Sequence, residues 1–183
     1  MSLVNKSIYA ILGILSIQPS TGYDIKRYSD KVLSGFWNEN FGHIYPTLKK
    51  MIESGLIENV PGEVEDRKIK YAITEKGKGE LKKWLSEEIQ TPAVRSELML
   101  KLLFGNDMSK EATIDMLSKQ KDIHEENLIK YLTMQQELTC EGSQITAKRS
   151  VYYNAILRKG IINSAANIEW CEETIESLKK LKG

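Results

Sequence analysis

Residues 42–57 read GHIYPTLKKMIESGLI, and this segment decides how the first half of the chain is interpreted. Apolar side chains recur in it at helical spacing, and Ser54-Gly55 ends the pattern as glycine commonly ends a helix. On a helical wheel the apolar residues gather on one face, at Ile44, Leu48, Met51 and Ile52. Gly42 and Pro46 are poor helix formers, but they lie at the helix start, where few backbone N–H groups have partners within the helix. We therefore expect an amphipathic helix with a bare, compact first turn.

Two helices are expected before this segment. The first runs from about Val4 to Ile17 and is stopped by Pro19. The second begins at Thr21, which is followed three residues later by Asp24 in a pattern close to a capping box. Its inward side chains are expected at Ile25, Tyr28, Val32 and Phe36. Three successive helices of this kind are typical of a helix-turn-helix domain.

Beyond the third helix the period changes from helical to alternating. Residues 56–60 are rich in β-formers, residues 61–68 are charged and turn-rich, and residues 68–74 alternate apolar with polar side chains. A two-stranded hairpin is therefore expected. Thr74 then caps a fourth helix, which carries Leu81, Trp84, Leu85 and Ile89. Three helices, a two-stranded wing and a fourth helix predict a winged helix-turn-helix domain over residues 1–90.

Residues 91–183 predict a second, helical domain, with a linker at residues 90–97. It should hold a short apolar helix, a long helix from about Ser109 to Leu138 and a final helix from about Lys148 to Leu181. The final helix would span about 50 Å, and its apolar residues follow a heptad with one polar member, Ser164. The residues assigned to this seam are Leu157, Ile161, Ile168, Cys171, Ile175 and Leu178.

Two partners are open for this seam. Pairing with a second copy is the simplest outlet, because so long a helix cannot be buried against one small domain. An antiparallel hairpin with the preceding long helix is the alternative, and both arrangements can hold together. The sequence thus predicts a mainly α-helical protein with a coiled-coil-like dimerisation helix.

The composition limits the classes of function. With 26 Lys and Arg against 25 Asp and Glu, the net charge is +1, so a nucleic-acid-binding surface must be a local patch. Two cysteines are too few for a disulfide framework or a zinc site, and they suit the reducing cytoplasm. The apolar run near the N-terminus is shorter than the roughly 20 residues that span a bilayer, so no membrane partner is expected. His124-Glu125 lacks the second histidine of a zinc-protease helix, and we expect no catalytic residue, metal or cofactor.

Several stretches carry recognisable motifs. The first domain contains ILGILSIQPSTGYDIKRYSD at residues 11–30, FGHIYPTLKKMIESGLIENV at 41–60 and DRKIKYAITEKGKGELKKWL at 66–85. With their Gly22-Tyr23-Asp24 and Gly-x-Ile-Tyr-Pro-x-Leu motifs, these stretches resemble the PadR family of bacterial transcriptional regulators. VRSELMLKLLFG and LRKGIINSAANIEW in the second domain resemble the C-terminal domain of its virulence-activator branch. The resemblance implies homodimers that bind operator DNA, usually as repressors and sometimes relieved by a small molecule.

The exposed side of the third helix should meet DNA, because a recognition helix makes contact through its N-terminal residues. Basic side chains on the wing and on the second helix should reach the DNA backbone or the minor groove. The predicted contacts are Gly42, His43, Tyr45, Pro46, Thr47, Lys49 and Lys50 on the third helix, Arg67, Lys68 and Lys70 on the wing, and Lys26 and Arg27 on the second helix. The sequence departs from the family in having a histidine after Gly42 and an acidic wing, with Glu63, Glu65 and Asp66 beside Arg67.

The start of the third helix carries only two lysines, a histidine and a threonine, so few base contacts are expected. Half-site spacing and DNA shape should therefore contribute much of the specificity. A two-fold dimer predicts a pseudo-palindromic operator in double-stranded DNA, with half-sites about 34–36 Å apart or a multiple of that distance. The alternatives are a winged-helix module that binds a helical protein partner, and a transcriptional activator of the same family. A small-molecule effector could be bound by Tyr131, Tyr152, Tyr153 and Trp170, for which ordinary aromatic core packing is the competing interpretation.

Overall fold

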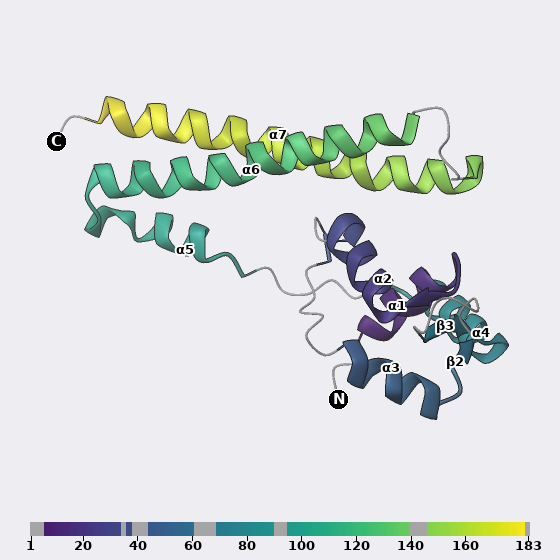
Figure 1. Cartoon of the computed structure of the whole chain (residues 1–183). Coiled ribbons are helices and arrows are strands. Elements are labelled where there is room, and N and C mark those ends of the chain that lie inside the picture. Colours follow the sequence, from purple (N-terminus) through teal and green to yellow (C-terminus); the bar gives the residue numbers. More distant parts are fainter. Residues whose placement is uncertain are drawn as a thin grey trace. The chain divides into compact units, whose positions relative to one another are not determined.

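The computed structural model describes residues 6–33, 36–37, 44–60, 69–89, 95–139 and 146–181. The chain divides into two compact units, Met1–Thr91 and Pro92–Gly183 (Figure 1). Predictions that fall on Gly42, His43, Arg67 and Lys68 lie outside the described residues.

The first unit begins with helix α1 (Ser7–Leu15), helix α2 (Gly22–Tyr28) and a π-helical turn η1 (Ser29–Leu33), followed by helix α3 (Ile44–Glu53). The predicted cap of α2 is present as a complete capping box. The backbone N–H of Asp24 donates to Thr21 Oγ1 at 3.1 Å, and the backbone N–H of Thr21 donates to Asp24 Oδ2 at 3.3 Å. Two N–H groups without partners in the helix are thereby satisfied, which fixes where α2 begins.

The core of the first unit lies between α1, α2 and α3. Its buried members are Ile11, Leu12, Ile14, Leu15, Ile25, Ile44, Leu48, Met51 and Ile57. The prediction that Phe36 points inward is wrong, because this side chain is exposed. The α-helical spacing used for that prediction ends at Tyr28, and the wider π-helical turn of η1 then changes which residues face the core.

A Schellman motif ends α3 and directs the chain into the sheet. Gly55 has φ 67°, its N–H donates to the Ile52 carbonyl at 2.8 Å, and the N–H of Leu56 donates to the Met51 carbonyl at 2.9 Å. This left-handed conformation suits glycine, so the glycine stop predicted at this position is confirmed. Strand β2 (Ile57–Val60) follows at once.

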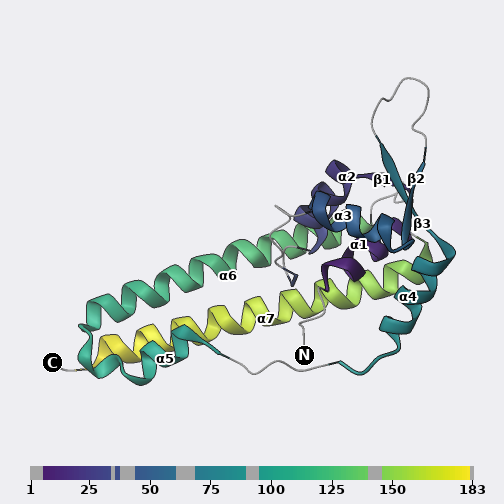
Figure 2. The same cartoon turned by 90° about the horizontal axis from the view of Figure 1, so that it is seen from below.

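The sheet has three antiparallel strands in the order β1-β3-β2 (Figure 2). β2 pairs with β3 (Lys70–Ile73) with Ile57 opposite Ile73, and the other edge of β3 takes β1 (Ser20–Thr21). The prediction of a two-stranded hairpin is therefore incomplete, because it does not include β1. A strand of two residues is too short to show the alternation that identifies strands in a sequence.

Helix α4 (Glu75–Leu85) packs on α1 and on β3. Thr74 Oγ1 accepts from the N–H of Gly77 at 3.0 Å and donates to the carbonyls of Gly55 and Leu56, so the predicted cap also joins α4 to β2. The ring of Trp84 stacks on Tyr9 with centroids 4.6 Å apart. The prediction that the helix carries Ile89 is wrong, since α4 ends at Leu85 with Ser86 as its C-cap.

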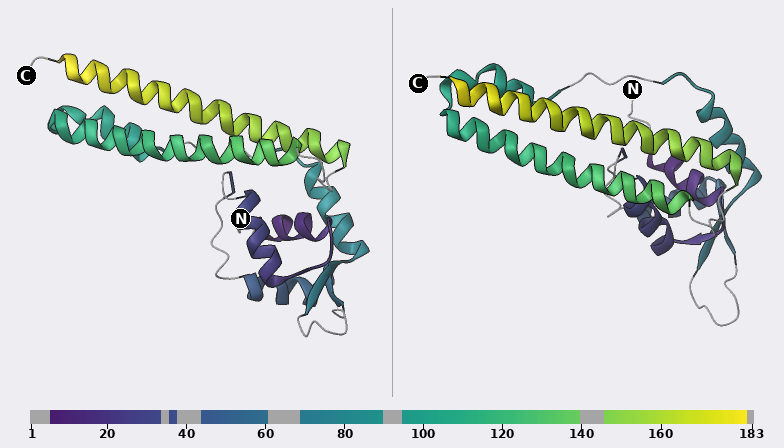
Figure 3. Two further views of the ribbon diagram at one scale, coloured as in Figure 1. Left: turned by 45° about the horizontal axis from the view of Figure 1, so that its top comes forward. Right: turned by 90° about the horizontal axis from the view of Figure 1, so that it is seen from above.

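The second unit consists of helix α5 (Glu97–Leu103), the 3-10 turn η3 (Gly105–Asp107), helix α6 (Lys110–Thr139) and helix α7 (Ala147–Lys180). α6 and α7 lie side by side as an antiparallel hairpin (Figure 3). Pairs such as Lys110 with Leu181 and Lys121 with Glu172 show the opposed chain directions.

The heptad seam of α7 faces α6 of the same chain. Leu157, Ile161, Ser164, Cys171 and Ile175 are buried, and Ile168 and Leu178 are half-buried. Across the seam, the ring of Tyr131 occupies the space that a side chain at Gly160 would need, since an added Cβ would lie 2.6 Å from the ring. The intramolecular hairpin, given above as the alternative, is thus the arrangement in the described chain. Contact of the six seam residues with a second copy stays a prediction.

Gly77 provides a test of the junction between α4 and β2. A Cβ there would collide with the Leu56 carbonyl oxygen and lie 2.9 Å from Ile73 Cγ1. Backbone cannot move aside cheaply, so we expect Gly77→Ala to lower the free energy of unfolding by about 2 kcal/mol. Urea unfolding of the full chain, followed by circular dichroism, measures this change.

Gly79 supplies the matched control, because a Cβ at this position in the same helix meets nothing within 4 Å. Gly79→Ala should be neutral or stabilising by up to about 1 kcal/mol, as expected for a helix interior. Equal effects of the two substitutions would contradict the close approach at Gly77.

Candidate nucleic-acid interface

The packing of α3 determines which of its side chains meet solvent. Ile44, Leu48 and Met51 are buried, with Leu48 only 1% exposed, so the rotation of the helix about its axis is set. The predicted contact residues on the other side are Tyr45, Pro46, Lys49 and Lys50, all exposed, and Thr47, which is half-buried. The structure therefore places four of the seven predicted α3 residues on one exposed side, with Thr47 at its edge.

Pro46 is compatible with this helix because of its position. It is the third residue of α3, which begins at Ile44, so an N–H at Pro46 would have no partner within the helix. The pyrrolidine ring also holds φ near the helical value. The proline therefore shapes a rigid first turn at little cost, and Lys49 and Lys50 follow one turn later.

The outer side of α2 forms a second basic surface, a shallow depression lined by Tyr23, Lys26, Arg27, Asp30 and Lys31. Lys26 Nζ lies 2.7 Å from Asp30, and Arg27 lies 3.3 Å from Asp24. The Arg27 guanidinium also lies over the Tyr23 ring, 5.9 Å from its centroid. Acidic partners reduce the field of the two predicted basic residues, so α2 suits a secondary backbone contact better than a primary one.

On the wing, the structure describes one of the three predicted contact residues. Lys70 is the first residue of β3, where it pairs with Val60 of β2 and Thr21 of β1, and it is half-buried. The strand register places it at the end of β3 that leads from residues 61–68.

The four aromatic residues suggested for an effector do not share one place in the second unit. Tyr131 is buried against Leu157 and Ile161, with Tyr153 packed beside this cluster, whereas Tyr152 is exposed. Trp170 lies 17 residues beyond Tyr153 on the same helix, roughly 25 Å away at 1.5 Å per residue. Within one chain, Tyr131 and Tyr153 act as core packing, and Trp170 is too distant to join them.

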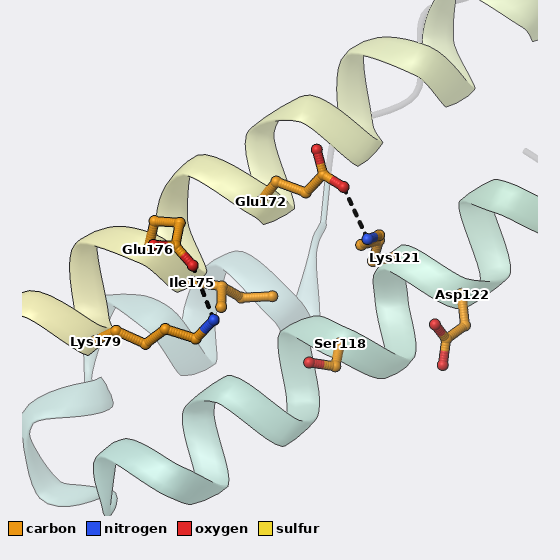
Figure 4. A pocket seen from close by; sticks show the side chains of 7 residues that line it. All are labelled: Ser118, Lys121, Asp122, Glu172, Ile175, Glu176 and Lys179. Carbon is orange, nitrogen blue, oxygen red and sulfur yellow. Dashed lines mark hydrogen bonds and ion pairs between the residues drawn. The ribbon is translucent and has the colours of Figure 1, made fainter.

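A polar groove along α6 and α7 was not predicted from the sequence. Its lining residues are Ser118, Lys121, Asp122, Glu172, Ile175, Glu176 and Lys179 (Figure 4). Lys121 Nζ lies 2.8 Å from Glu172 across the helices and 3.4 Å from Glu125 along its own helix, and Lys179 lies 2.8 Å from Glu176. Since these charges pair with each other, the groove is better suited to fixing the register of the hairpin than to holding a charged ligand.

Three groups at the α6–α7 interface have a raised pKa. A hydrogen bond to Glu172 raises the pKa of Lys121 above its ordinary value of 10.5. Burial raises the pKa of Tyr131 above 10.0, and burial also raises the pKa of the Cys171 thiol above 9.0, partly opposed by Lys121. Each group therefore binds its proton more tightly in the folded chain than in the unfolded chain.

These raised pKa values predict that the free energy of unfolding falls at alkaline pH. The contribution of a group with a raised pKa is complete below its unfolded pKa and is lost as the pH rises through its folded pKa. The free energy of unfolding should therefore fall as the pH rises above about 9, where Cys171 titrates in the unfolded chain. Urea unfolding between about pH 7.5 and 10.5 measures the curve.

Cys171→Ala is the informative variant, because it should flatten the first part of the fall, near about pH 9, while the later part remains. Stability that stays constant or rises over this range would contradict the assignment.

A winged helix-turn-helix unit with an exposed basic helix tip, joined to a helical unit, is the architecture of DNA-binding regulators. Residues 11–83 match the family model for the transcriptional regulator PadR-like family, and residues 94–179 match the virulence activator alpha C-term model. The chain thus carries a PadR-like transcriptional regulator domain followed by a virulence activator alpha C-terminal domain, and it is homologous to PadR regulators. None of the helices that the structure describes is long and apolar enough to cross a membrane.

Known proteins resemble the chain over nearly its whole length. The negative transcriptional regulator PadR of Bacillus subtilis is 28% identical over 177 residues, covering 94% of this chain and 97% of that protein. The crystal structure of that PadR with operator DNA has a TM-score of 0.78 at 27% identity and covers 94% of this chain and 98% of that chain. A structure of the same protein with p-coumaric acid has a TM-score of 0.75 at 28% identity, with coverage of 94% and 98%. The Vibrio cholerae virulence activator AphA has a TM-score of 0.75 at 25% identity, with coverage of 94% and 97%.

Proposed function

We propose that this transcriptional regulator is a homodimeric repressor that acts in the cytoplasm, has no catalytic activity and binds a pseudo-palindromic operator in double-stranded DNA. The observation that carries the proposal is the tip of α3, where Tyr45, Pro46, Lys49 and Lys50 are exposed on one side of a helix whose other side is buried. The similarity to a PadR solved with operator DNA, and named a negative regulator, supports the same role.

The proposed contacts divide by chemistry. Lys49 and Lys50 bind phosphates or guanine edges, and Tyr45 and Thr47 add contacts at the first turn. Lys26 and Arg27 on α2 contact the flanking backbone, and Lys70 contributes with the rest of the wing. Gly42, His43, Arg67 and Lys68 complete the proposed set from outside the described residues. Because the net charge is only +1, these local charges carry the attraction to DNA.

Exposed apolar residues of the second unit support a dimer. α5 contains Leu100, 57% exposed, and Leu103, 73% exposed, and among the described residues of this helix none is buried. Met99 and Phe104 are exposed beside them, so a soluble chain would need to cover this region. On α7, Val151, Ile156 and Ile162 are exposed as well, which leaves apolar area for a second copy although the heptad seam is occupied.

The proposal includes a small-molecule effector that relieves repression. The complex of Bacillus subtilis PadR with p-coumaric acid supports it, and no feature of this chain names the ligand. Tyr152 is the exposed member of the four aromatic residues suggested by the sequence and is therefore the best placed to meet a ligand. An activator is the second candidate for the sign of regulation, favoured by the similarity to AphA.

The lysines of α3 give the direct test. We expect Lys49→Ala/Lys50→Ala to weaken binding to DNA by tenfold or more at about 100 mM salt and to reduce the salt dependence of log K by up to about 2. The probe is a duplex selected by the wild-type protein from a randomised library. Fluorescence anisotropy at several salt concentrations measures both quantities.

Lys82→Ala/Lys83→Ala is the matched control, because it removes an exposed lysine pair from α4, outside the helix-turn-helix. Its affinity and salt slope should stay near those of the wild-type protein. If both pairs have the same effect, or if the wild-type protein selects no duplex at low salt, the α3 tip is not a DNA-binding site.

The dimer gives a second test. Two identical units related by a two-fold axis should protect two symmetric half-sites about 34–36 Å apart or a multiple of that distance. Hydroxyl-radical footprinting on the selected duplex, together with sedimentation of the complex, measures the spacing and the protein-to-DNA ratio. Protection of one asymmetric site by a single chain would contradict the homodimer.

A further inference from the structure

Gly22, the first residue of α2, lies against the ring of Tyr45 from α3. A Cβ added to Gly22 would lie 2.7 Å from Tyr45 Cε1, 3.2 Å from Cζ and 3.3 Å from the hydroxyl oxygen. Backbone freedom does not explain the glycine, because Gly55 is the one glycine with a positive φ among those that the structure describes. The space at Gly22 is instead occupied by a side chain from the next helix.

The contacted side chain is one that the proposed function needs. Tyr45 is 61% exposed, yet the hydroxyl end of its ring rests against the start of α2. The ring is therefore anchored at its tip, while most of its surface remains open. Pro46 follows immediately and restricts the backbone on the other side. An aromatic side chain held in this way loses little further conformational entropy when it binds.

We propose that Gly22 is a positioning residue for DNA binding: the absence of its side chain lets the ring of Tyr45 lie against α2, in the orientation that contacts DNA. The inference rests on the proposed function and adds a specificity determinant to it. Since the hydroxyl end faces Gly22, the ring itself makes the contact, as apolar contact with a sugar or a thymine methyl. Gly22 does not touch DNA in this account and acts through Tyr45.

The two crowded glycines of the first unit should then behave in opposite ways. At Gly77 the neighbours are a backbone carbonyl and a core side chain, so an added methyl disturbs the fold. At Gly22 the three nearest atoms belong to the far end of an exposed side chain, which can swing away. Gly22→Ala should therefore displace the ring and weaken DNA binding, with little loss of stability.

The experiment uses the full chain and the duplex that the wild-type protein selects. Its variants are Gly22→Ala, Tyr45→Ala, Tyr45→Phe, the double variant Gly22→Ala/Tyr45→Ala, and Gly79→Ala as an unobstructed control. We expect Gly22→Ala and Tyr45→Ala each to weaken binding about tenfold, the double variant to be no weaker than Tyr45→Ala, and Gly79→Ala to match the wild-type protein. Tyr45→Phe, which keeps the ring, should lose less affinity than Tyr45→Ala. The melting temperature of Gly22→Ala should stay within about 3 °C of the wild-type value.

Three results would overturn the inference while leaving the proposed function intact. One is wild-type affinity of Gly22→Ala for a duplex whose binding is lost in Lys49→Ala/Lys50→Ala. Another is a further loss on adding Gly22→Ala to Tyr45→Ala, which would mean that Gly22 acts by another route. The third is a large fall in melting temperature for Gly22→Ala, which would make the glycine structural. If the wild-type protein selects no duplex, the proposed function itself fails, and the inference fails with it.

Discussion

The burial of one side of α3 is the interaction on which the DNA-binding unit depends. Ile44, Leu48 and Met51 fill the core against α1 and α2, and each contributes about 1.5–3 kcal/mol when fully buried. A helix anchored along one side cannot rotate about its axis, so the other side is presented to solvent in a fixed orientation. The exposed group of Tyr45, Pro46, Lys49 and Lys50 is the consequence of that packing.

The same anchoring determines the path of the chain after α3. Met51 is buried in the core, so the end of α3 has a fixed position. The Schellman motif at Gly55 therefore determines where β2 begins, and β3 pairs with β2 in a defined register. Thr74 then ties the start of α4 back to Leu56. As a result, α3 and the two strands β2 and β3 share one support, which would hold the proposed DNA-binding side chains in fixed relative positions.

In the second unit the equivalent constraint is the seam between α6 and α7. Leu157, Ile161 and Cys171 are buried between α6 and α7, so the two long helices of one chain form a stiff hairpin. The exposed apolar side chains of α5 then become the surface that most needs a partner. In the proposed homodimer, a stiff second unit would set the separation of the two DNA-binding units and so the spacing of the half-sites.

The sequence allowed a good prediction of local structure and of which α3 side chains are exposed, whereas their contact with DNA stays a prediction. Capping at Thr21 and Thr74 and the stop at Gly55 depend on hydrogen bonds within a few residues, and the structure confirms them. The exposed tip of α3 followed from helical period alone. The prediction for Phe36 was wrong because the π-helical turn η1 interrupts the α-helical period. β1 was missed because a strand of two residues is too short to show an alternating pattern.

What the sequence by itself determined, therefore, is the order of the elements, their caps and the apolar side of each helix, because period and short-range hydrogen bonding encode these features. Only the tertiary structure showed which elements pack against each other and through which side chains. The partner of the α7 seam, the pairing of Lys121 with Glu172 and the contact of Gly22 with Tyr45 join residues that are far apart in the chain. No local pattern carries that information, since such contacts depend on how whole elements pack.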